Sequence, residues 1–239
     1  MDFPLLYEFL SQIESNNNRE WFQRHKATYD TLRLQFLDFT QSLINKLVRI
    51  DPSIAYLRPQ DTIYRFYRDT RFSADKSPYK RHFGTFINAR GKKSITGGYY
   101  LHLQPNHSFA TVGSYYLPSN ILNQCRKEID ANQYAWNEII HNTAFLTSFG
   151  SPAANASDSF FPKGEKGFGL NAVKTAPKGF KKDHPLIDSL RLKDYCAWHS
   201  VEFNEQSNDD LITDQALHFF EIGKPLHDFT NPIIEDMLS

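Results

Sequence analysis

The stretch IYRFYRDTRFSADKSPYKRHFG (residues 63–84) opens the part of the chain in which short strands replace helices. Aromatic or β-branched runs follow it, and turn residues separate them, as is typical of an antiparallel meander. The predicted strands cover residues 63–68, 83–88, 98–103 and 108–115. In the third of them, Leu101 and Leu103 alternate with His102, which predicts one buried face and one face that is wet or used.

Helical periodicity dominates on both sides of this region. A short helix is predicted over residues 3–13 and a long one over residues 19–49, whose apolar residues recur every three or four positions. Downstream, the sequence predicts helices over residues 119–132, 134–149, 185–193, 209–222 and 231–238, and a strand over residues 195–203. Residues 163–169 are rich in Gly and Lys, and we expect a loop there.

These elements predict an α+β fold made of a single domain, residues 1–239. An antiparallel sheet from about residues 63–115 would be covered by the long N-terminal helix and by C-terminal helices. The low-complexity run GSPAANASDS (residues 150–159) predicts a flexible loop near residues 150–162.

Composition excludes a strong global field, because Lys plus Arg and Asp plus Glu number 27 each. Charge is nevertheless uneven along the chain. Residues 65–81 hold six basic and two acidic residues, residues 163–193 hold eight and three, and the segment from residue 207 onward carries seven acids against Lys224. The two basic segments and the acidic tail either form a binding face and a solvated face or neutralise one another, and the sequence leaves both interpretations open.

Other features point to a soluble cytoplasmic protein without a membrane segment. The N-terminus lacks the basic region of a signal peptide, and no apolar run approaches the roughly 20 residues of a membrane-spanning helix. Cys125 and Cys196 have no metal-binding spacing, and two cysteines are too few for a disulfide scaffold. Because no His or Cys motif of a metal site occurs either, we expect no metal.

The arginine-rich run is the best candidate for a functional site. Charge within an aromatic, strand-like segment must be paired internally or must meet an anion from outside. Arg65, Arg68 and Arg71 suit two-point contact with phosphate or carboxylate. Asp69 is expected to pair with Arg71 or with a neighbouring strand, and Asp75 is expected to bond backbone amides ahead of it in a turn.

The run also resembles a known family. The string RFYRDTRFSADKSPYK (residues 65–80) is similar to the hallmark of conserved hypothetical proteins grouped as domain of unknown function 2461. Further similarity lies at the N-terminal residues 18–22, at residues 99–102 with Gly113, and at residues 177–180 and 183–185, so that it covers nearly the whole chain. Arg81 and His82 depart from the pattern, where small or polar residues are more usual. The resemblance implies no activity, because the family has none assigned.

Two functional hypotheses follow. In the first, a pocket or enzyme site binds a small phosphorylated or carboxylated ligand, with Asp69 or Asp75 orienting the cations or serving as base. The ligand-binding residues would be Arg65, Arg68, Arg71, Lys76 and Lys80, with Lys174 and Lys178 as an opposite wall. In the second, the chain is a non-catalytic binding module for a protein or nucleic acid, and the run is a structural ion-pair network. Neutral net charge and missing motifs disfavour nucleic acid, and no cofactor is indicated.

Overall fold

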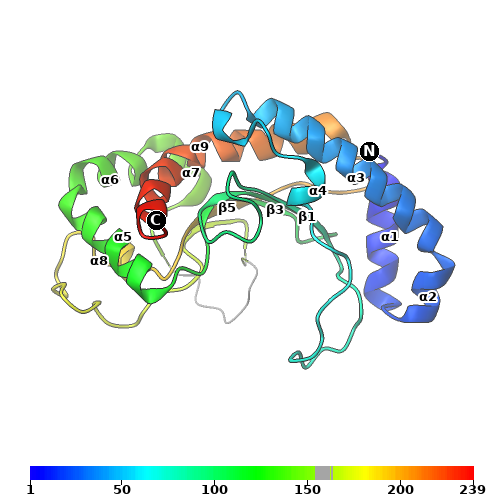
Figure 1. Ribbon diagram of the computed structural model, residues 1–239, viewed down its shortest axis with the longest axis horizontal. Coiled ribbons are helices and arrows are strands. Elements are labelled where there is room, and N and C mark those ends of the chain that lie inside the picture. The colour runs from blue at the N-terminus through cyan, green and yellow to red at the C-terminus, as the bar shows by residue number, and fades with distance from the viewer. Residues whose placement is uncertain (154–161, 163) are drawn as a thin grey trace. The chain divides into compact units, whose positions relative to one another are not determined.

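The computed structural model describes residues 1–153, 162 and 164–239, and within them it confirms the α+β class (Figure 1). The helices are α1 (Phe3–Ser15), α2 (Arg19–Arg24), α3 (Lys26–Leu47), η1 (Pro52–Ile54), α4 (Pro59–Thr62), α5 (Ser119–Ala131), α6 (Gln133–Ile140), α7 (Thr143–Phe149), α8 (Ile187–Arg191) and α9 (Asp209–Asp236). The strands are β1 (Phe83–Ile87), β2 (Gly98–Leu103), β3 (Phe109–Ser114), β4 (Lys166–Phe168) and β5 (Tyr195–Ser200).

The described strands form one antiparallel sheet in the order β1-β2-β3-β5-β4. The sheet therefore extends beyond residues 63–115, the range expected from the sequence. Strand β4 lies where we expected a loop, and it pairs with β5 from Lys166 opposite His199 to Phe168 opposite Ala197. Its three residues are too few for a periodic pattern, so only the partner strand defines it.

The chain divides into two compact units. The first unit contains Met1–Lys92, Tyr100–Phe109 and Val201–Leu217. The second contains Lys93–Tyr99, Ala110–Ser200 and His218–Ser239. A single domain over residues 1–239 stays a prediction.

In the first unit, the N-terminal helices begin at side-chain caps. The Asp2 carboxylate accepts a hydrogen bond from the Leu5 amide at 3.0 Å, and the Asn18 side chain accepts one from the Trp21 amide at 2.9 Å. Such caps satisfy amides that have no partner within the helix.

The long helix expected over residues 19–49 is wrong in one respect, because it is interrupted at His25. This residue leaves helical geometry with φ −105° and ψ 14°, and its ring stacks on Trp21 at 3.9 Å between centroids. Its ring Nδ1 lies 2.8 Å from the Trp21 carbonyl oxygen. These local contacts end α2 and let α3 start in a new direction, a break that apolar periodicity does not reveal.

Residues 63–85 form the feature that we call the hairpin. In its stem, residues 63–67 run antiparallel to residues 79–85, and residues 68–78 form its loop. The Arg68 amide donates to the Pro78 carbonyl at 2.9 Å, and the Lys80 amide donates to the Phe66 carbonyl at 2.8 Å. The expected strand over residues 63–68 is reduced to isolated bridges, which pair Ile63 with Thr85 and Tyr67 with Tyr79.

An aromatic cluster anchors the stem to the helices. Phe66 is 3% exposed and lies at the centre of this cluster. Its ring centroid is 5.0 Å from that of Tyr29 on α3 and 5.6 Å from that of Phe83 on β1. Phe22 of α2 stacks on Tyr79 of the opposite side of the stem at 4.0 Å. Since such pairs contribute about 0.5–1.5 kcal/mol beyond area burial, the hairpin is held by ring packing.

The second unit is organised around buried polar contacts. The guanidinium of Arg126 on α5 donates to the Leu190 carbonyl at 2.7 Å and to the Leu192 carbonyl at 3.1 Å. The Asp194 carboxylate accepts hydrogen bonds from the Leu170 and Asn171 amides, both at 2.9 Å. These groups satisfy loop backbone that would otherwise be buried without partners.

The C-terminal region forms one helix where the sequence predicted two. Helix α9 continues through Pro225 and Pro232, which lie inside it. In the second unit, Gly223 permits a close approach to β3, because an added Cβ would lie 1.9 Å from Val112. Tertiary packing thus outweighs the loss of backbone hydrogen bonds at proline. Most of the flexible loop predicted near residues 150–162 lies outside the described residues.

Candidate functional site

Two arginines of the motif are paired within the hairpin loop. Arg68 Nη1 lies 2.6 Å from Asp75 Oδ2 and also donates to the Ser77 carbonyl at 3.1 Å. Arg71 forms a two-point pair with Asp69, through Nε at 3.0 Å and Nη2 at 2.7 Å. Of the two partners expected for Asp69, the structure shows Arg71, and both guanidinium groups already have a carboxylate.

Asp75 organises the loop through local hydrogen bonds. Its carboxylate accepts the Ser77 amide at 2.8 Å, as the predicted turn requires, and the Ser77 hydroxyl also donates to it. The same carboxylate lies 3.8 Å from the Arg81 guanidinium. Lys76 Nζ donates to the Thr70 carbonyl at 3.0 Å. Lys76 is therefore held to the loop backbone.

The carboxylates of the loop are weak bases. Hydrogen bonds from the Arg71 side chain and amide lower the pKa of Asp69 to about 2. Hydrogen bonds from Ser77, and then from Arg68, hold the pKa of Asp75 well below its usual range. A general base for neutral pH needs a pKa nearer 7, so this geometry favours a positioning role for both residues.

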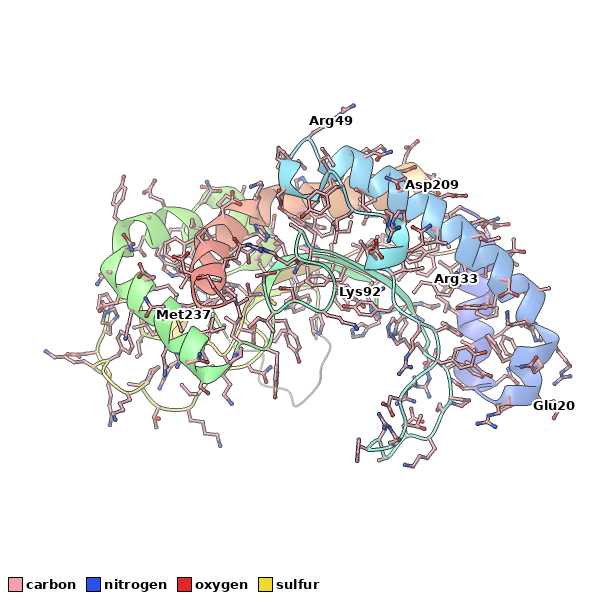
Figure 2. All side chains as sticks on the ribbon, in the orientation of Figure 1. Glu20, Arg33, Arg49, Lys92, Asp209 and Met237 are labelled. Carbon is pink, nitrogen blue, oxygen red and sulfur yellow. The ribbon has the colours of Figure 1, made fainter. Side chains whose placement is uncertain are left out.

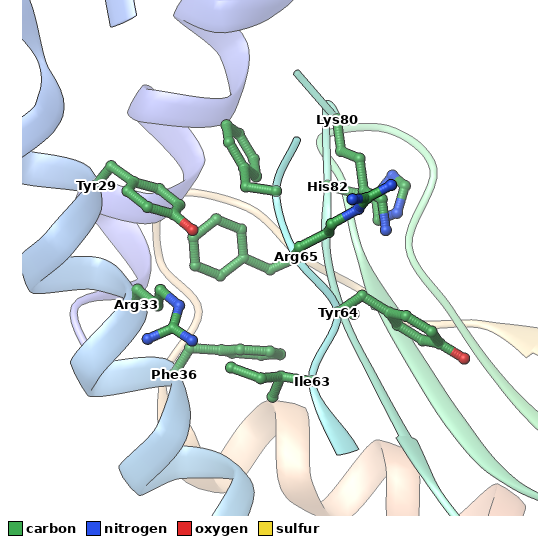
Figure 3. A pocket seen from close by; sticks show the side chains of 11 residues that line it. Tyr29, Arg33, Phe36, Ile63, Tyr64, Arg65, Lys80 and His82 are labelled. Carbon is green, nitrogen blue, oxygen red and sulfur yellow. The ribbon is translucent and has the colours of Figure 1, made fainter. Parts of the chain in front are cut away.

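The stem presents a different arrangement, a pocket in the first unit (Figure 3). The pocket encloses about 300 Å³ of empty space, part of which is open solvent. Its lining residues are Tyr29, Arg33, Phe36, Ile63, Tyr64, Arg65, Phe66, Lys80, His82, Phe83 and Gly84. Three of them are cationic and none carries a carboxylate.

Arg65 and Lys80 come from the two sides of the stem, and Figure 3 shows them close together beside His82. Arg65 makes no hydrogen bond or ion pair with any residue in the part of the chain that the structure describes, although its charge helps to lower the pKa of Asp69. Lys80 Nζ lies over the Tyr64 ring, 4.8 Å from its centroid. Burial, and then the charge of Arg65, lower the pKa of Lys80 to about 8.

Arg33 completes the cationic lining from helix α3 (Figures 2 and 3). It lies one helical turn after Tyr29, whose phenol pKa is raised by burial and lowered in part by the Arg33 guanidinium. Sequence reasoning missed Arg33, Tyr29 and Tyr64 as residues of the pocket. The available signal was the four-residue spacing from Tyr29 to Arg33, which places an arginine beside the buried stripe of the helix.

A set of uncharged rings lies next to the cations. His82 is 4.1 Å from His102 between ring centroids, and His102 stacks on Phe109 at 4.7 Å. The Tyr100 hydroxyl lies 2.9 Å from His102 Nδ1, and Gln104 Oε1 lies 3.2 Å from His102 Nε2. Burial, and then the charge of Lys80, lower the pKa of His82 to about 3, so His82 is neutral at pH 7.

The base of the hairpin is also fixed. Lys92 Nζ donates to the carbonyl oxygens of Gln60 and Ile63, at 3.1 Å and 2.8 Å (Figure 2). Gly84 needs to be small, because an added Cβ would lie 2.6 Å from the Tyr100 hydroxyl. These contacts hold the start and the end of the stem in place around the pocket.

The second basic cluster lies in the second unit. Lys174 and Lys178 are exposed, and the Lys174 carbonyl accepts a hydrogen bond from Arg191 at 2.8 Å. Their role as an opposite wall to the arginine run stays a prediction. His184 pairs with Asp130, 2.9 Å away.

The described residues contain neither a metal-binding cluster nor a membrane-spanning helix. Within residues 1–153, 162 and 164–239, no group of three or more His, Cys, Asp or Glu side chains is arranged to hold a metal ion. None of the described helices combines the length and the apolar character that crossing a membrane requires.

Fold and site together define an α+β protein with a cationic pocket beside an aromatic-anchored hairpin. A family model described as a conserved hypothetical protein (DUF2461) matches residues 6–229, and the chain belongs to this family. The family suggested by the sequence is thereby confirmed. No curated protein and no solved structure matches the chain.

Proposed function

We propose that this protein binds a small phosphorylated or carboxylated ligand in the pocket of the hairpin stem, with Arg65 and Lys80 as the main contacts and Arg33 as a third cation. One observation carries the proposal: the pocket lining contains three cationic side chains and no carboxylate. In the hairpin loop, the arginines pair with carboxylates of the chain itself. In the pocket, the carboxylate or phosphate that pairs with the cations would belong to a ligand.

Electrostatics support an anionic ligand. Like charges near one another repel, and partial burial reduces the screening of that repulsion by water. Burial, and then the charge of Arg65, lower the pKa of Lys80 to about 8. An anion between Lys80 and Arg65 would offset both effects, and arginine would supply two-point hydrogen bonding to a phosphate or carboxylate.

The proposal narrows the set of ligand-binding residues. Arg68 and Arg71 are paired with Asp75 and Asp69, so in this proposal they shape the loop and do not contact the ligand. Lys76 is tied to the loop backbone and takes no part in the pocket. The ligand would also have to be small, because part of the roughly 300 Å³ of empty space in the pocket is open solvent.

Binding is tested by calorimetry and thermal shift with phosphate, sulfate and small carboxylates. We expect stabilisation of the wild type by at least one of these anions, and an affinity at least tenfold lower for Arg65→Gln. Arg71→Gln is the matched control, since it removes a hairpin guanidinium that lies outside the pocket. Equal responses of Arg65→Gln and the wild type to every anion would contradict the proposal.

A second function is favoured by one observation at the tip of the hairpin. Phe72 is 97% exposed, and the Arg71 guanidinium lies 5.8 Å from its ring centroid. Exposed aromatic and basic side chains together are suited to contact with a nucleic acid or a protein. Binding of single-stranded nucleic acid that weakens steeply with salt and is lost in Phe72→Ala would support this function. Binding that is absent at low salt would exclude nucleic acid.

A further inference from the structure

The amine of Lys80 has an unusual environment for a lysine. Its Nζ lies on an aromatic face, and within the described residues no carboxylate or carbonyl oxygen forms an ion pair or hydrogen bond with it. The chain around it is fixed, since the Lys80 amide donates to the Phe66 carbonyl within the stem. Lys76, four residues earlier in the chain, instead donates to the Thr70 carbonyl oxygen.

We infer that Lys80 is a nucleophilic amine that forms an imine with a small carbonyl compound bearing an anionic group, such as a 2-oxo acid, whose anionic group is held by Arg65. This inference rests on the proposed function and adds the class of ligand and a chemical step. The inference is based on three kinds of group that, among the described residues, line one pocket: the amine of Lys80 without an ion pair, the guanidinium of Arg65 without a carboxylate, and uncharged rings.

The pocket raises the fraction of Lys80 side chains that carry a neutral amine. Only the neutral amine attacks a carbonyl, and lysine is activated by desolvation or by a neighbouring cation. Burial and the charge of Arg65 act together to lower the pKa of Lys80 to about 8, from the ordinary 10.5. At pH 7.5 roughly a quarter of such amines are neutral, against about one in a thousand for an exposed lysine.

The groups that face Lys80 agree with this chemistry. The charge of Arg65 favours the neutral amine, and His82 and Tyr64 are uncharged at neutral pH. No carboxylate lines the pocket to restore the ammonium form. When an anionic group binds, it would meet Arg65 first, since arginine stays protonated and lysine can release its proton.

The step balances without an oxidant or a cofactor. The Nζ lone pair forms a bond to the carbonyl carbon while the carbonyl π electrons move to oxygen. Both amine hydrogens reach that oxygen through solvent, and the carbon–oxygen bond breaks as carbon–nitrogen double bonding forms. One water leaves for each imine formed.

The experiment traps the imine in the full chain. The protein is incubated at pH 7.5 with glyoxylate and sodium cyanoborohydride, and the modified lysines are located by peptide mass mapping. We expect Lys80 to gain a carboxymethyl group at least tenfold faster than Lys76, which serves as the internal comparison. We also expect this preference to fall at least fivefold in Arg65→Gln.

Propanal, a carbonyl compound without an anionic group, separates the two parts of the inference. Slower labelling of Lys80 by propanal than by glyoxylate, relative to Lys76, supports the role of the anion. Equal preference for both probes overturns the ligand class. In Lys80→Met the fast label should disappear. If the variant were labelled at another residue as fast as the wild type is at Lys80, the inference would be overturned.

The outcome is distinguishable from failure of the proposed function. Glyoxylate or phosphate that stabilises the wild type and not Arg65→Gln, with Lys80 labelled no faster than Lys76, overturns the imine and keeps the anion site. Absence of both stabilisation and selective labelling overturns both.

Discussion

In the hairpin loop, Arg68 and Arg71 each lie against a carboxylate, whereas in the stem Arg65 and Lys80 lie close to one another and to aromatic rings. The two regions belong to one short motif and carry similar cations. Their difference shows that the density of charge in a sequence does not locate a binding site. What matters is which cations remain after internal pairing.

The origin of the difference is geometric. In the loop, the chain turns tightly enough for Asp69 to reach Arg71 two residues later and for Asp75 to cap Ser77. In the stem, extended backbone rises about 3.3 Å per residue, so that Arg65 lies too far along the chain for Asp69 to reach it. Aromatic packing then brings cations from distant segments to the same pocket.

The largest expected effect concerns the packing that holds the stem. Phe66→Ala should lower the free energy of unfolding by about 3–5 kcal/mol, because it leaves a cavity among the rings of the first unit. Urea unfolding followed by tryptophan fluorescence measures this change. Phe72→Ala is the matched control from the loop, and it should change stability by less than about 0.5 kcal/mol, since Phe72 is exposed. Similar losses in the two variants would contradict the contrast between stem and loop.

The next effect concerns His82 and acid. Burial lowers the folded-state pKa of His82 to about 3, below the ordinary 6.5, so the unfolded chain binds more protons between these values. Stability is therefore lost as pH falls from about 6.5 towards 3. At pH 5 the stability lost through His82 is about 2 kcal/mol. In His82→Gln, the free energy of unfolding should therefore fall by about 2 kcal/mol less between pH 7 and pH 5 than in the wild type. An unchanged difference would show that His82 titrates normally in the folded protein.

Removal of the Lys80 charge should stabilise the protein. At pH 7, Lys80→Met should raise the free energy of unfolding by about 1 kcal/mol, once the pKa shift is discounted for partial exposure of the ammonium. The folded-state pKa is lowered, so the wild type gains stability as pH rises from about 8 to 10.5 and the advantage of the variant should shrink over that range. Denaturant unfolding at pH 7 and pH 9.5 tests the sign. Destabilisation by Lys80→Met at pH 7 would indicate that Lys80 has an internal partner.

Replacement of a loop arginine by methionine should lower the free energy of unfolding, in contrast to Lys80→Met. Arg68→Met removes hydrogen bonds to the Ser73 hydroxyl and the Ser77 carbonyl, and should lower stability by about 1 kcal/mol. Arg71→Met should have the smallest effect, because the Arg71–Asp69 pair is exposed. Thermal unfolding of the three methionine variants side by side ranks them. If Arg68→Met stabilised the protein, the contrast between paired cations in the loop and unpaired cations in the stem would be contradicted.

Much of the local structure could be predicted from the sequence. Periodicity located most helices and four strands of the sheet, and the residues of the loop predicted its turn and gave the Asp69–Arg71 pair as one of two alternatives. Two of the errors lie where contacts distant in sequence decide, because strand β4 and the continuous helix α9 depend on partners that no local pattern names. The break at His25 depends instead on its local ring contact with Trp21, which apolar periodicity does not reveal.

The sequence by itself therefore determined the α+β class, the family and the pairing of charges that are neighbours along the chain, because these depend on short-range periodicity and turn chemistry. Only the tertiary structure decided which cations line a pocket. Arg33 comes from α3, Arg65 from one side of the stem and Lys80 from the other, and ring packing around Phe66 joins these segments. Such packing depends on the complementary shapes of side chains far apart in sequence, which a linear pattern does not contain.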